Sequence, residues 1–252
     1  MPTEFFRSLL SRTYRSAQVW LCDGRNDERG ERSRIPKAIL CWSSGKDSAW
    51  TLHVLRQRQE VEVVGLLTTI NEVHDRVAMH AVRVALLQAQ AEAVGLPLWT
   101  VPIPSPCSNQ QYEMAMETAI ERALAAGVTV MAFGDLFLEE VRRYRETQLT
   151  GTGLAPLFPI WGLSTTLLAR EMVSAGLRAR ITCVDPKQIL ASFVGREFDD
   201  ALLADLPASA DPCGERGEFH TFAYAGPMFS HPVPIQTGEI VTRDGFVFAD
   251  LR

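Results

Sequence analysis

A strand, a tight turn and the start of a helix follow one another between Lys37 and Trp50, and this unit constrains the fold more than any other stretch. Ile39–Cys41 is a short apolar run suited to a strand that is covered on both faces. Small residues break the run at Ser43–Gly45, and a helical pattern opens at Asp47. A turn of this kind aims backbone N–H groups at one point, so the sequence predicts an anion-binding site there.

The turn differs from the phosphate-binding loop of the common nucleoside triphosphatases. That loop needs a glycine five residues before its Gly-Lys pair and Ser or Thr directly after it, whereas Leu40 and Asp47 occupy those positions here. The stretch instead resembles the PP-loop, Ser-Gly-Gly-x-Asp-Ser, of the N-type ATP pyrophosphatases, which cut ATP between its α and β phosphates. Ser44 replaces the first glycine, which requires a backbone turn that a non-glycine residue can adopt. The matching residues are Ser43, Gly45, Asp47 and Ser48.

Strands and helices alternate beyond this turn. The apolar patterns predict strands at 61–69, 97–103 and 128–133, and helices at 79–94, 109–126 and 138–149. This alternation indicates βαβ units, and hence an α/β fold with a Rossmann-like parallel sheet flanked by helices. Ligands of such sheets bind beyond the carboxyl ends of the strands. We therefore expect the segments 43–48, 68–76 and 134–145 to share one crevice.

The pattern changes near residue 160. A helix is predicted at 164–175 and a strand at 178–184, followed by irregular structure from Pro186 to about residue 217 and a terminal hairpin at 235–251 turned by Asp244-Gly245. We predict a nucleotide-binding domain at 35–160 and a smaller α+β domain on the substrate side at 161–252. Residues 1–34 have no sustained apolar core, which argues against a secretory signal. Their enrichment in Arg and Ser is a feature of transit peptides, but Glu4, Asp23 and Glu28 argue against one, so we expect a poorly ordered extension.

A second chemically dense stretch runs from Asp211 to Thr221. Its glycines permit close backbone approach, and its carboxylates and histidine can bind or move protons, although a solvated turn would explain the same residues. Together the motifs resemble the diphthine–ammonia ligase family from about Lys37 to Phe229. The resemblance rests on the first turn, Gly134-Asp135 with Arg142 and Glu146, the Pro159-Ile160-Trp161 tripeptide, and the stretch from Gly214 to Thr221. Arg216 and His220 depart from the family pattern, as does the spacing of Arg142 and Arg145. In these departures the chain resembles bacterial relatives of the ligase.

The predicted ATP-binding residues are Ser43, Ser44, Gly45, Lys46, Asp47, Ser48 and Asp135. Amides and hydroxyls of the turn would bind the phosphates, with Lys46 as a charged donor to the same oxygens. Asp47 would hold Mg²⁺ at the leaving pyrophosphate, although the helix dipole also favours a carboxylate at this position. Asp135 ends a buried strand at the ligand edge of the sheet.

The predicted substrate-binding residues are Arg142, Arg145, Gly214, Glu215, Gly217, Glu218 and Thr221. The arginines could clamp a phosphate or a carboxylate, and a solvated helix face is the alternative. Glu218 and His220 alternate with their neighbours as on a strand with one wet face. His220 is the candidate general base because its unperturbed pKa is near neutral. The predicted catalytic set is Lys46, Asp47, Glu218 and His220.

The resemblance implies a cytoplasmic, ATP-dependent carbon–nitrogen ligase. It would activate a small or protein-borne carboxylate as its acyl-adenylate, from which ammonia displaces AMP, and pyrophosphate would be released earlier. Another PP-loop reaction, such as thiolation of a tRNA base, is one alternative, against which the lack of paired cysteines counts. A non-catalytic nucleotide-binding sensor of the same architecture is another.

Composition limits the partners. The chain has 25 Lys and Arg against 30 Asp and Glu, a net charge of −5, which argues against a surface that coats nucleic acid. Five scattered cysteines without a Cys-x-x-Cys pair fit a reducing cytoplasm rather than a disulfide framework. No apolar run approaches membrane-spanning length. The sequence is compatible with a homodimer.

Overall fold

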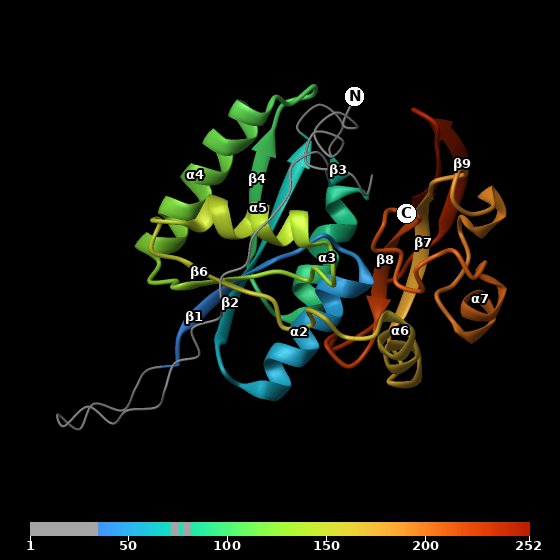
Figure 1. Ribbon diagram of the computed structural model, residues 1–252, viewed down its shortest axis with the longest axis horizontal. Helices are drawn as coiled ribbons and strands as arrows, with labels where there is room; N and C mark the ends of the chain where they lie inside the picture. The colour runs from blue at the N-terminus through green and yellow to red at the C-terminus, as the bar shows by residue number, and fades with distance from the viewer. Residues whose placement is uncertain (1–34, 72–75, 78–81) are drawn as a thin grey trace.

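The computed structural model describes residues 35–71, 76–77 and 82–252 (Figure 1). The predicted extension at 1–34 and residues 72–75 of the second predicted loop lie outside the described residues. In the described parts of the chain, no helix is long and apolar enough to cross a membrane.

The first sheet confirms the predicted α/β fold. Its parallel strands lie in the order β4 (Leu98–Ile103), β2 (Glu62–Asn71), β1 (Lys37–Cys41), β5 (Val130–Ala132) and β6 (Ala155–Leu157). The short β3 (Arg76–Val77) pairs antiparallel with the end of β2. The sequence pattern missed β6, which has only three residues with a proline at its centre.

Helices cover both faces of this sheet (Figure 1). Side chains alternate between the faces of a strand, so Leu40 of β1 packs in one core cluster and Ile39 in the other. The first cluster includes α2 (Lys46–Arg58) and α3 (Val84–Val94), and the second includes α4 (Asn109–Ala125) and the end of α5 (Glu139–Leu149). Of the predicted helix at 79–94, the described residues show helix only from Val84.

The second part of the chain forms an antiparallel sheet. Its strands lie in the order β8 (Phe219–Ala225), β7 (Arg178–Val184), β10 (Phe246–Leu251) and β9 (Thr237–Arg243), with α6 (Thr165–Ser174) packed beside it. The predicted hairpin turn is confirmed, because Asp244 and Gly245 have φ of 51° and 84°. The region predicted as irregular contains a 3₁₀ turn at Ala191–Phe193 and the short helix α7 (Asp200–Asp205).

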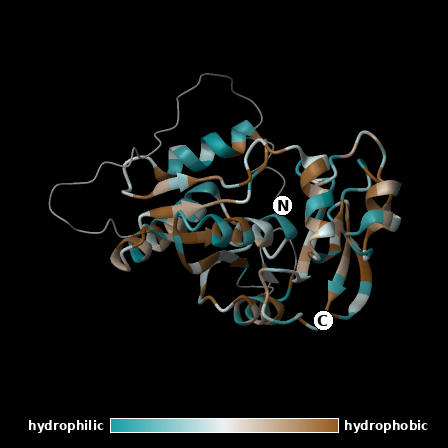
Figure 2. Cartoon of the chain, turned by 90° about the horizontal axis from the view of Figure 1, so that it is seen from below, coloured by the Kyte–Doolittle hydropathy of each residue, from teal (hydrophilic) through white to brown (hydrophobic). Residues whose placement is uncertain are grey.

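The two sheets share one of the apolar cores. The core cluster that contains Leu40 and Leu52 continues through Ile181, Phe222 and Val247 of the second sheet. Figure 2 shows apolar residues along the strands of both sheets. The segments that follow β1, β2 and β5 begin at the same edge of the first sheet, as the connectivity predicted, and this edge faces β8 through α2.

Candidate functional site

The turn at residues 43–48, between β1 and α2, has the backbone that its sequence pattern demands. Ser44, which stands where the pattern has glycine, has φ of 69°, in the left-handed region that glycine adopts readily. Its carbonyl accepts hydrogen bonds from the Ala223 amide (2.9 Å) and from Nε2 of Gln90 (2.9 Å). The turn is therefore held from α3 on one side and from β8 on the other.

Hydroxyls complete the 43–48 turn. Ser43 Oγ lies 3.2 Å from Ser48 Oγ and accepts the Gly45 amide at 3.3 Å. Thr221 Oγ1, from β8, accepts the Lys46 amide at 3.0 Å. The Ser44 hydroxyl is fully buried and has no hydrogen-bond partner among the described residues. A buried hydroxyl without a partner is costly unless a ligand uses it.

Ser44→Gly is expected to raise the free energy of unfolding of the nucleotide-free protein by about 1 kcal/mol. The change removes a left-handed serine, which costs about 1–3 kcal/mol, and a buried hydroxyl without a partner, against the larger backbone entropy of glycine in the unfolded chain. Urea unfolding measures the difference. Ser43→Gly is the control and should lower stability, since Ser43 does not have a positive φ and its hydroxyl accepts the Gly45 amide. A destabilised Ser44→Gly would contradict the strain argument.

Lys46 does not lie where the sequence analysis placed it. Its side chain is 2% exposed and points into the second sheet's core. There the ammonium lies 5.4 Å from the ring centroids of Phe198 and Phe219, and donates to the Cys213 carbonyl. It also pairs with both carboxylate oxygens of Asp47, at 3.0 and 2.8 Å. In this structure Lys46 joins the two sheets rather than presenting a free donor to phosphate oxygens.

The charge of Lys46 depends on Asp47. Burial lowers the pKa of Lys46, but the charge and hydrogen bond of the adjoining Asp47, together with Cys213 and Glu215, raise it by more, so the ammonium keeps its proton. Asp47 retains access to solvent, with a side chain that is 25% exposed. A carboxylate that contacts a buried ammonium on one side and solvent on the other can still accept a further cation.

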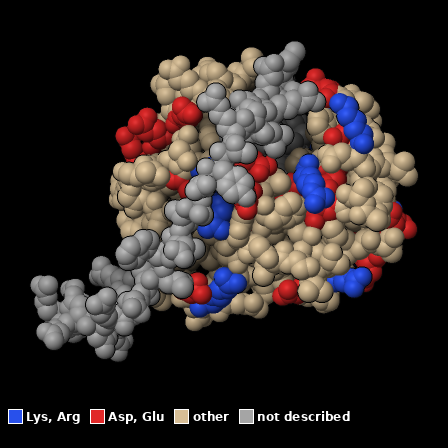
Figure 3. All heavy atoms as spheres, viewed as in Figure 1, with Lys and Arg blue, Asp and Glu red and all other residues tan. Residues whose placement is uncertain are grey.

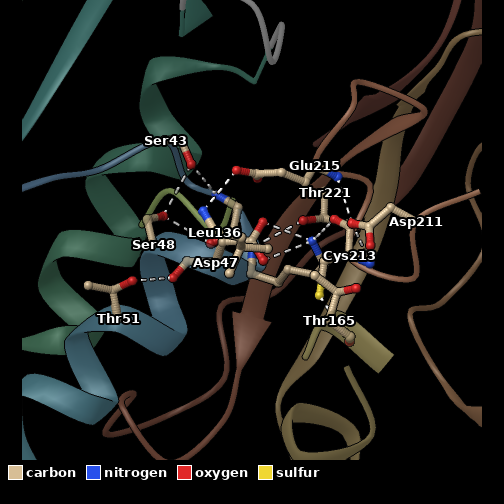
Figure 4. Close-up of polar contacts among 12 residues, drawn as sticks. Ser43, Asp47, Ser48, Thr51, Leu136, Thr165, Asp211, Cys213, Glu215 and Thr221 are labelled. Atoms are coloured by element: carbon tan, nitrogen blue, oxygen red, sulfur yellow. Dashed lines mark hydrogen bonds and ion pairs between the residues drawn. The ribbon is translucent and has the colours of Figure 1, made fainter. Parts of the chain in front are cut away.

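The 211–217 loop closes over the turn from the second sheet (Figure 4). Asp211 shapes it by accepting the amides of Cys213 (3.2 Å) and Glu215 (3.0 Å). Gly214 must be glycine, because its φ is 71° and a Cβ there would lie 2.8 Å from the Phe219 carbonyl oxygen. Gly217 also has a positive φ, of 83°, but a Cβ there would meet no atom within 4 Å.

Glu218 is not on a wet face, and this prediction was wrong. The residue is 1% exposed, and its two carboxylate oxygens accept the amides of Asp211 (2.8 Å) and Arg216 (3.0 Å). Glu218 precedes β8 instead of lying within it, so the strand alternation used for the prediction does not apply. Its carboxylate holds the 211–217 loop in shape.

His220 and Thr221 also differ from the predictions. Thr221 is buried and its hydroxyl accepts the Lys46 amide, so it supports the 43–48 turn instead of facing a substrate. His220 is half-buried, and burial together with the charge of Lys46 lowers its pKa to about 4. The imidazole is therefore neutral at pH 7 but is a weaker base than the near-neutral pKa assumed for it.

Glu215 connects the 211–217 loop to the carboxyl end of β5. Its Oε1 accepts the Leu136 amide at 2.8 Å (Figure 4). Burial raises the pKa of Glu215 from 4.5 to about 8, and the neighbouring carboxylates of Asp47 and Asp135 add to the rise. At neutral pH the side chain of Glu215 is thus mostly protonated and adds no negative charge to the site.

Glu215→Gln is expected to remove a pH dependence of folding stability. Because the folded state holds a proton that the unfolded state releases, the contribution of Glu215 is present below pH 4.5 and is lost as the pH rises to about 8. The variant keeps an acceptor for the Leu136 amide, so it should match the parent near pH 4.5 and exceed its stability near pH 8. Urea unfolding across this range measures the effect. The exposed Glu139→Gln should leave the pH profile unchanged, and parallel profiles for the parent and Glu215→Gln would contradict the assignment.

The segment after β5 lies against the turn. A Cβ on Gly134 would lie 3.0 Å from Thr51 Oγ1 and 3.1 Å from the Asp47 carbonyl carbon, so any other residue would push this segment away from α2 by a few tenths of an ångström. The next residue, Asp135, pairs with Arg145, whose Nε lies 3.5 Å from Asp135 Oδ2. Figure 4 shows Leu136, Glu215 and Asp47 converging on this region. The 43–48 turn and the segment after β5 therefore lie side by side, as predicted.

The two predicted arginines differ in position. Arg145 packs 5.0 Å above the Phe133 ring beside Asp135, at the ligand edge. Arg142 pairs with Glu146 at 2.8 Å and lies 4.9 Å from the ring centroid of Trp161. Glu146 and the rings of Phe158 and Trp161 thus occupy the Arg142 guanidinium, whereas Arg145 lies beside Asp135, and both arginines remain candidate ligand-binding residues.

Gln90 is a residue of the site that the sequence analysis missed. It is fully buried on α3, accepts the Trp42 indole N–H at 2.9 Å and donates to the carbonyls of Ser44 and Ala223. The only signal in the sequence was a glutamine on an otherwise apolar helix face.

In the part of the chain that the structure describes, no group of three or more His, Cys, Asp or Glu side chains could hold a metal ion.

Comparison with known proteins covers most of the chain. Residues 36–154 match the family model of the diphthamide synthase N-terminal domain, and residues 164–249 match that of the diphthamide synthase C-terminal domain. The chain is similar to proteins named diphthine–ammonia ligase from Bos taurus (26% identical over 237 residues), Rattus norvegicus (26% over 232 residues) and Homo sapiens (25% over 237 residues). Each of these alignments spans 82% of this chain and 85% of the relative.

Proposed function

Because this chain belongs to the diphthamide synthase family, we propose that it is an ATP-dependent amide-forming ligase of the diphthine–ammonia ligase kind. It activates a carboxylate as an acyl-adenylate, releases pyrophosphate, and lets ammonia displace AMP. The observation that carries this proposal is the 43–48 turn. Its left-handed Ser44 follows β1, next to the topological switch point between β1 and β5 where the strand order reverses. Open α/β sheets bind nucleotides at such a point.

The residues present suit ATP as a substrate. The first amides of α2 have no acceptor within the helix, and the helix dipole favours an anion beside them. The buried Ser44 hydroxyl lacks a partner among the described residues, and the glycine at position 134 lets the segment after β5 lie close against the start of α2. We propose that Ser43, Ser44, Gly45 and Ser48 bind phosphate oxygens there.

The second domain would exclude water from the labile adenylate. The Lys46 ammonium and the Glu215 carboxyl group bridge the 211–217 loop to the turn and to the end of β5. Protonated Glu215 adds no full negative charge beside the phosphates, and the ion pair with Arg145 offsets the charge of Asp135. Stabilising the charge that develops on the phosphates and excluding water are the two tasks of such a site.

Asp47 is the residue that would hold Mg²⁺. Magnesium bound with a nucleotide takes one or two carboxylates and completes its coordination with phosphate oxygens and water. The part of the Asp47 side chain exposed to solvent suits this arrangement, with Lys46 on its other side. When bound, the ion would neutralise charge on the leaving pyrophosphate.

The two alternatives find less support. Thiolation chemistry requires reactive thiolates, yet burial raises the pKa of both Cys41 and Cys183 to about 12. The described residues on the face in Figure 3 carry separate Lys and Arg side chains interspersed with acidic ones, rather than the continuous basic stripe of an RNA-binding surface. A nucleotide-binding sensor would share the turn and needs an activity assay to be distinguished.

Exchange of labelled pyrophosphate into ATP tests the proposal. The purified protein with ATP, Mg²⁺ and a panel of carboxylic acids should incorporate label only with an acid that it activates, and should form AMP when ammonia is added. Formation of ADP as the only product would rule out a PP-loop reaction. Binding of ATP without exchange or AMP for any acid, including protein-borne diphthine, would favour the sensor.

A further inference from the structure

Strand β9 is an open edge of the second sheet. Among the described residues it pairs only with β10, and it lies at the end of the sheet remote from β8, which carries Thr221 (Figure 1). Both of its faces are open, because Ile240 is 59% and Val241 is 37% exposed. Exposed edges of this kind template pairing with another strand unless charge, proline or a bulge protects them.

The hairpin register shows which backbone groups point outward. A two-residue turn makes its flanking residues, Arg243 and Phe246, a hydrogen-bonded pair, and such pairs alternate along an antiparallel ladder. Val241 and Phe248 form the next hydrogen-bonded pair. The N–H and C=O groups of Ile240 and Thr242 therefore point away from β10. The register irregularity between Ala249 and Leu251 places both Gly238 and Glu239 opposite Asp250, so the bulge ends at Glu239 and the pairing from Ile240 to Arg243 is regular.

We propose that β9 pairs antiparallel with β9 of a second copy of this chain, about a two-fold axis at Val241. In this register Ile240 faces Thr242 of the partner subunit, and their outward N–H and C=O groups can exchange hydrogen bonds. Glu239 then lies opposite Arg243 of the partner subunit, and symmetry repeats the pair. Directly opposed residues of opposite charge stabilise a strand pair, and like charges destabilise it.

Charge complementarity is what selects a second copy as the occupant. Glu239 and Arg243 are exposed, and neither has an ion-pair partner within the described residues. Moving the axis by one residue would lose the match, since Glu239 would then face Val241 of the partner subunit. A strand whose own charges complement each other about a two-fold axis is what a closed dimer interface requires.

The dimer leaves the nucleotide site untouched. The β9 edge lies across the sheet from β8, with β10 and β7 between them. The inference therefore stands independently of the proposed function, and the ligase assay should be unaffected by changes in β9.

Sedimentation velocity over a range of protein concentrations tests the inference. The full chain should show a concentration-dependent dimer. Glu239→Arg and Arg243→Glu should each raise the dimer dissociation constant at least tenfold, and the double variant should restore it, because the opposed charges match again. The distant, exposed Glu117→Arg is the matched control and should dimerise like the parent.

Thr242→Pro separates pairing from folding. It removes an N–H group that points away from β10, and proline is tolerated on edge strands at such positions. The variant should be monomeric while its circular dichroism and melting temperature stay close to those of the parent. A parent chain that is monomeric at every concentration, or a double charge reversal that fails to restore the dimer, would overturn the proposal.

Discussion

Asp47→Asn is expected to reduce AMP formation by about 10²- to 10³-fold, the usual loss when one charge-stabilising group is removed from a reaction centre. It should also lower the free energy of unfolding by about 2 kcal/mol. Removing one member of a fully buried ion pair costs about 3–5 kcal/mol because the other charge is left unpaired. We expect less here because the Asp47 side chain is 25% exposed. Pyrophosphate exchange and urea unfolding measure the two effects.

A double variant separates catalysis from folding. Lys46→Met/Asp47→Asn removes both charges and keeps the packing of the lysine stem between Phe198 and Phe219. Its stability should recover to near that of the parent, while AMP formation stays as low as in the single variant. Full activity of either Asp47 variant would remove Asp47 from the reaction. A double variant no more stable than Asp47→Asn would show that Lys46 is not held by Asp47.

Gln90→Leu is the second large effect expected. The change leaves the Trp42 indole N–H and the Ala223 carbonyl buried without Gln90, and each such loss costs about 1–3 kcal/mol. Stability should therefore fall by about 3 kcal/mol. Because Gln90 also holds the Ser44 carbonyl, the KM for ATP should rise by about tenfold, which corresponds to 1.4 kcal/mol of binding free energy.

Two comparisons distinguish positioning from simple destabilisation. Gln88→Leu changes an exposed glutamine on the same helix and should alter neither stability nor KM. Gln90→Glu keeps the acceptor for Trp42 but faces two carbonyls, and only its protonated form can donate to one of them. Its KM for ATP should therefore improve as the pH falls. A KM that is independent of pH in Gln90→Glu, measured on fully folded protein, would show that Gln90 does not position the turn.

The sequence was sufficient for four of the strands of the first sheet and for the shape of the turn. The alternating strands, the helix-ending glycines Gly95 and Gly127, and the apolar run before Ser43 act locally, so their patterns survive without knowledge of the rest of the chain. The hairpin at Asp244-Gly245 was predictable for the same reason, since it depends on two backbone angles. The three-residue β6 was not, because it has neither length nor alternation and is defined only by its neighbour β5.

Side-chain directions in the site were not predictable. Lys46 looked like a phosphate donor because it follows a glycine at a helix start, but its direction is set by Phe198, Cys213 and Phe219, which lie far along the chain. Glu218 looked exposed because it alternates with apolar residues, but the loop that precedes it folds back so that its oxygens accept the amides of Asp211 and Arg216. Tertiary contacts of this kind leave no periodic signal in a sequence.

The anchoring of the 43–48 turn by β8 has a consequence for how such chains can be shortened or recombined. A fragment that ended near residue 160 would retain the complete motif, yet it would lack the Ala223 amide, the Thr221 hydroxyl and the Cys213 carbonyl that shape it. Possession of the signature alone is thus no guarantee of a competent loop. The domain that carries the 43–48 turn and the domain that carries β8 should therefore be kept together when such chains are truncated or recombined.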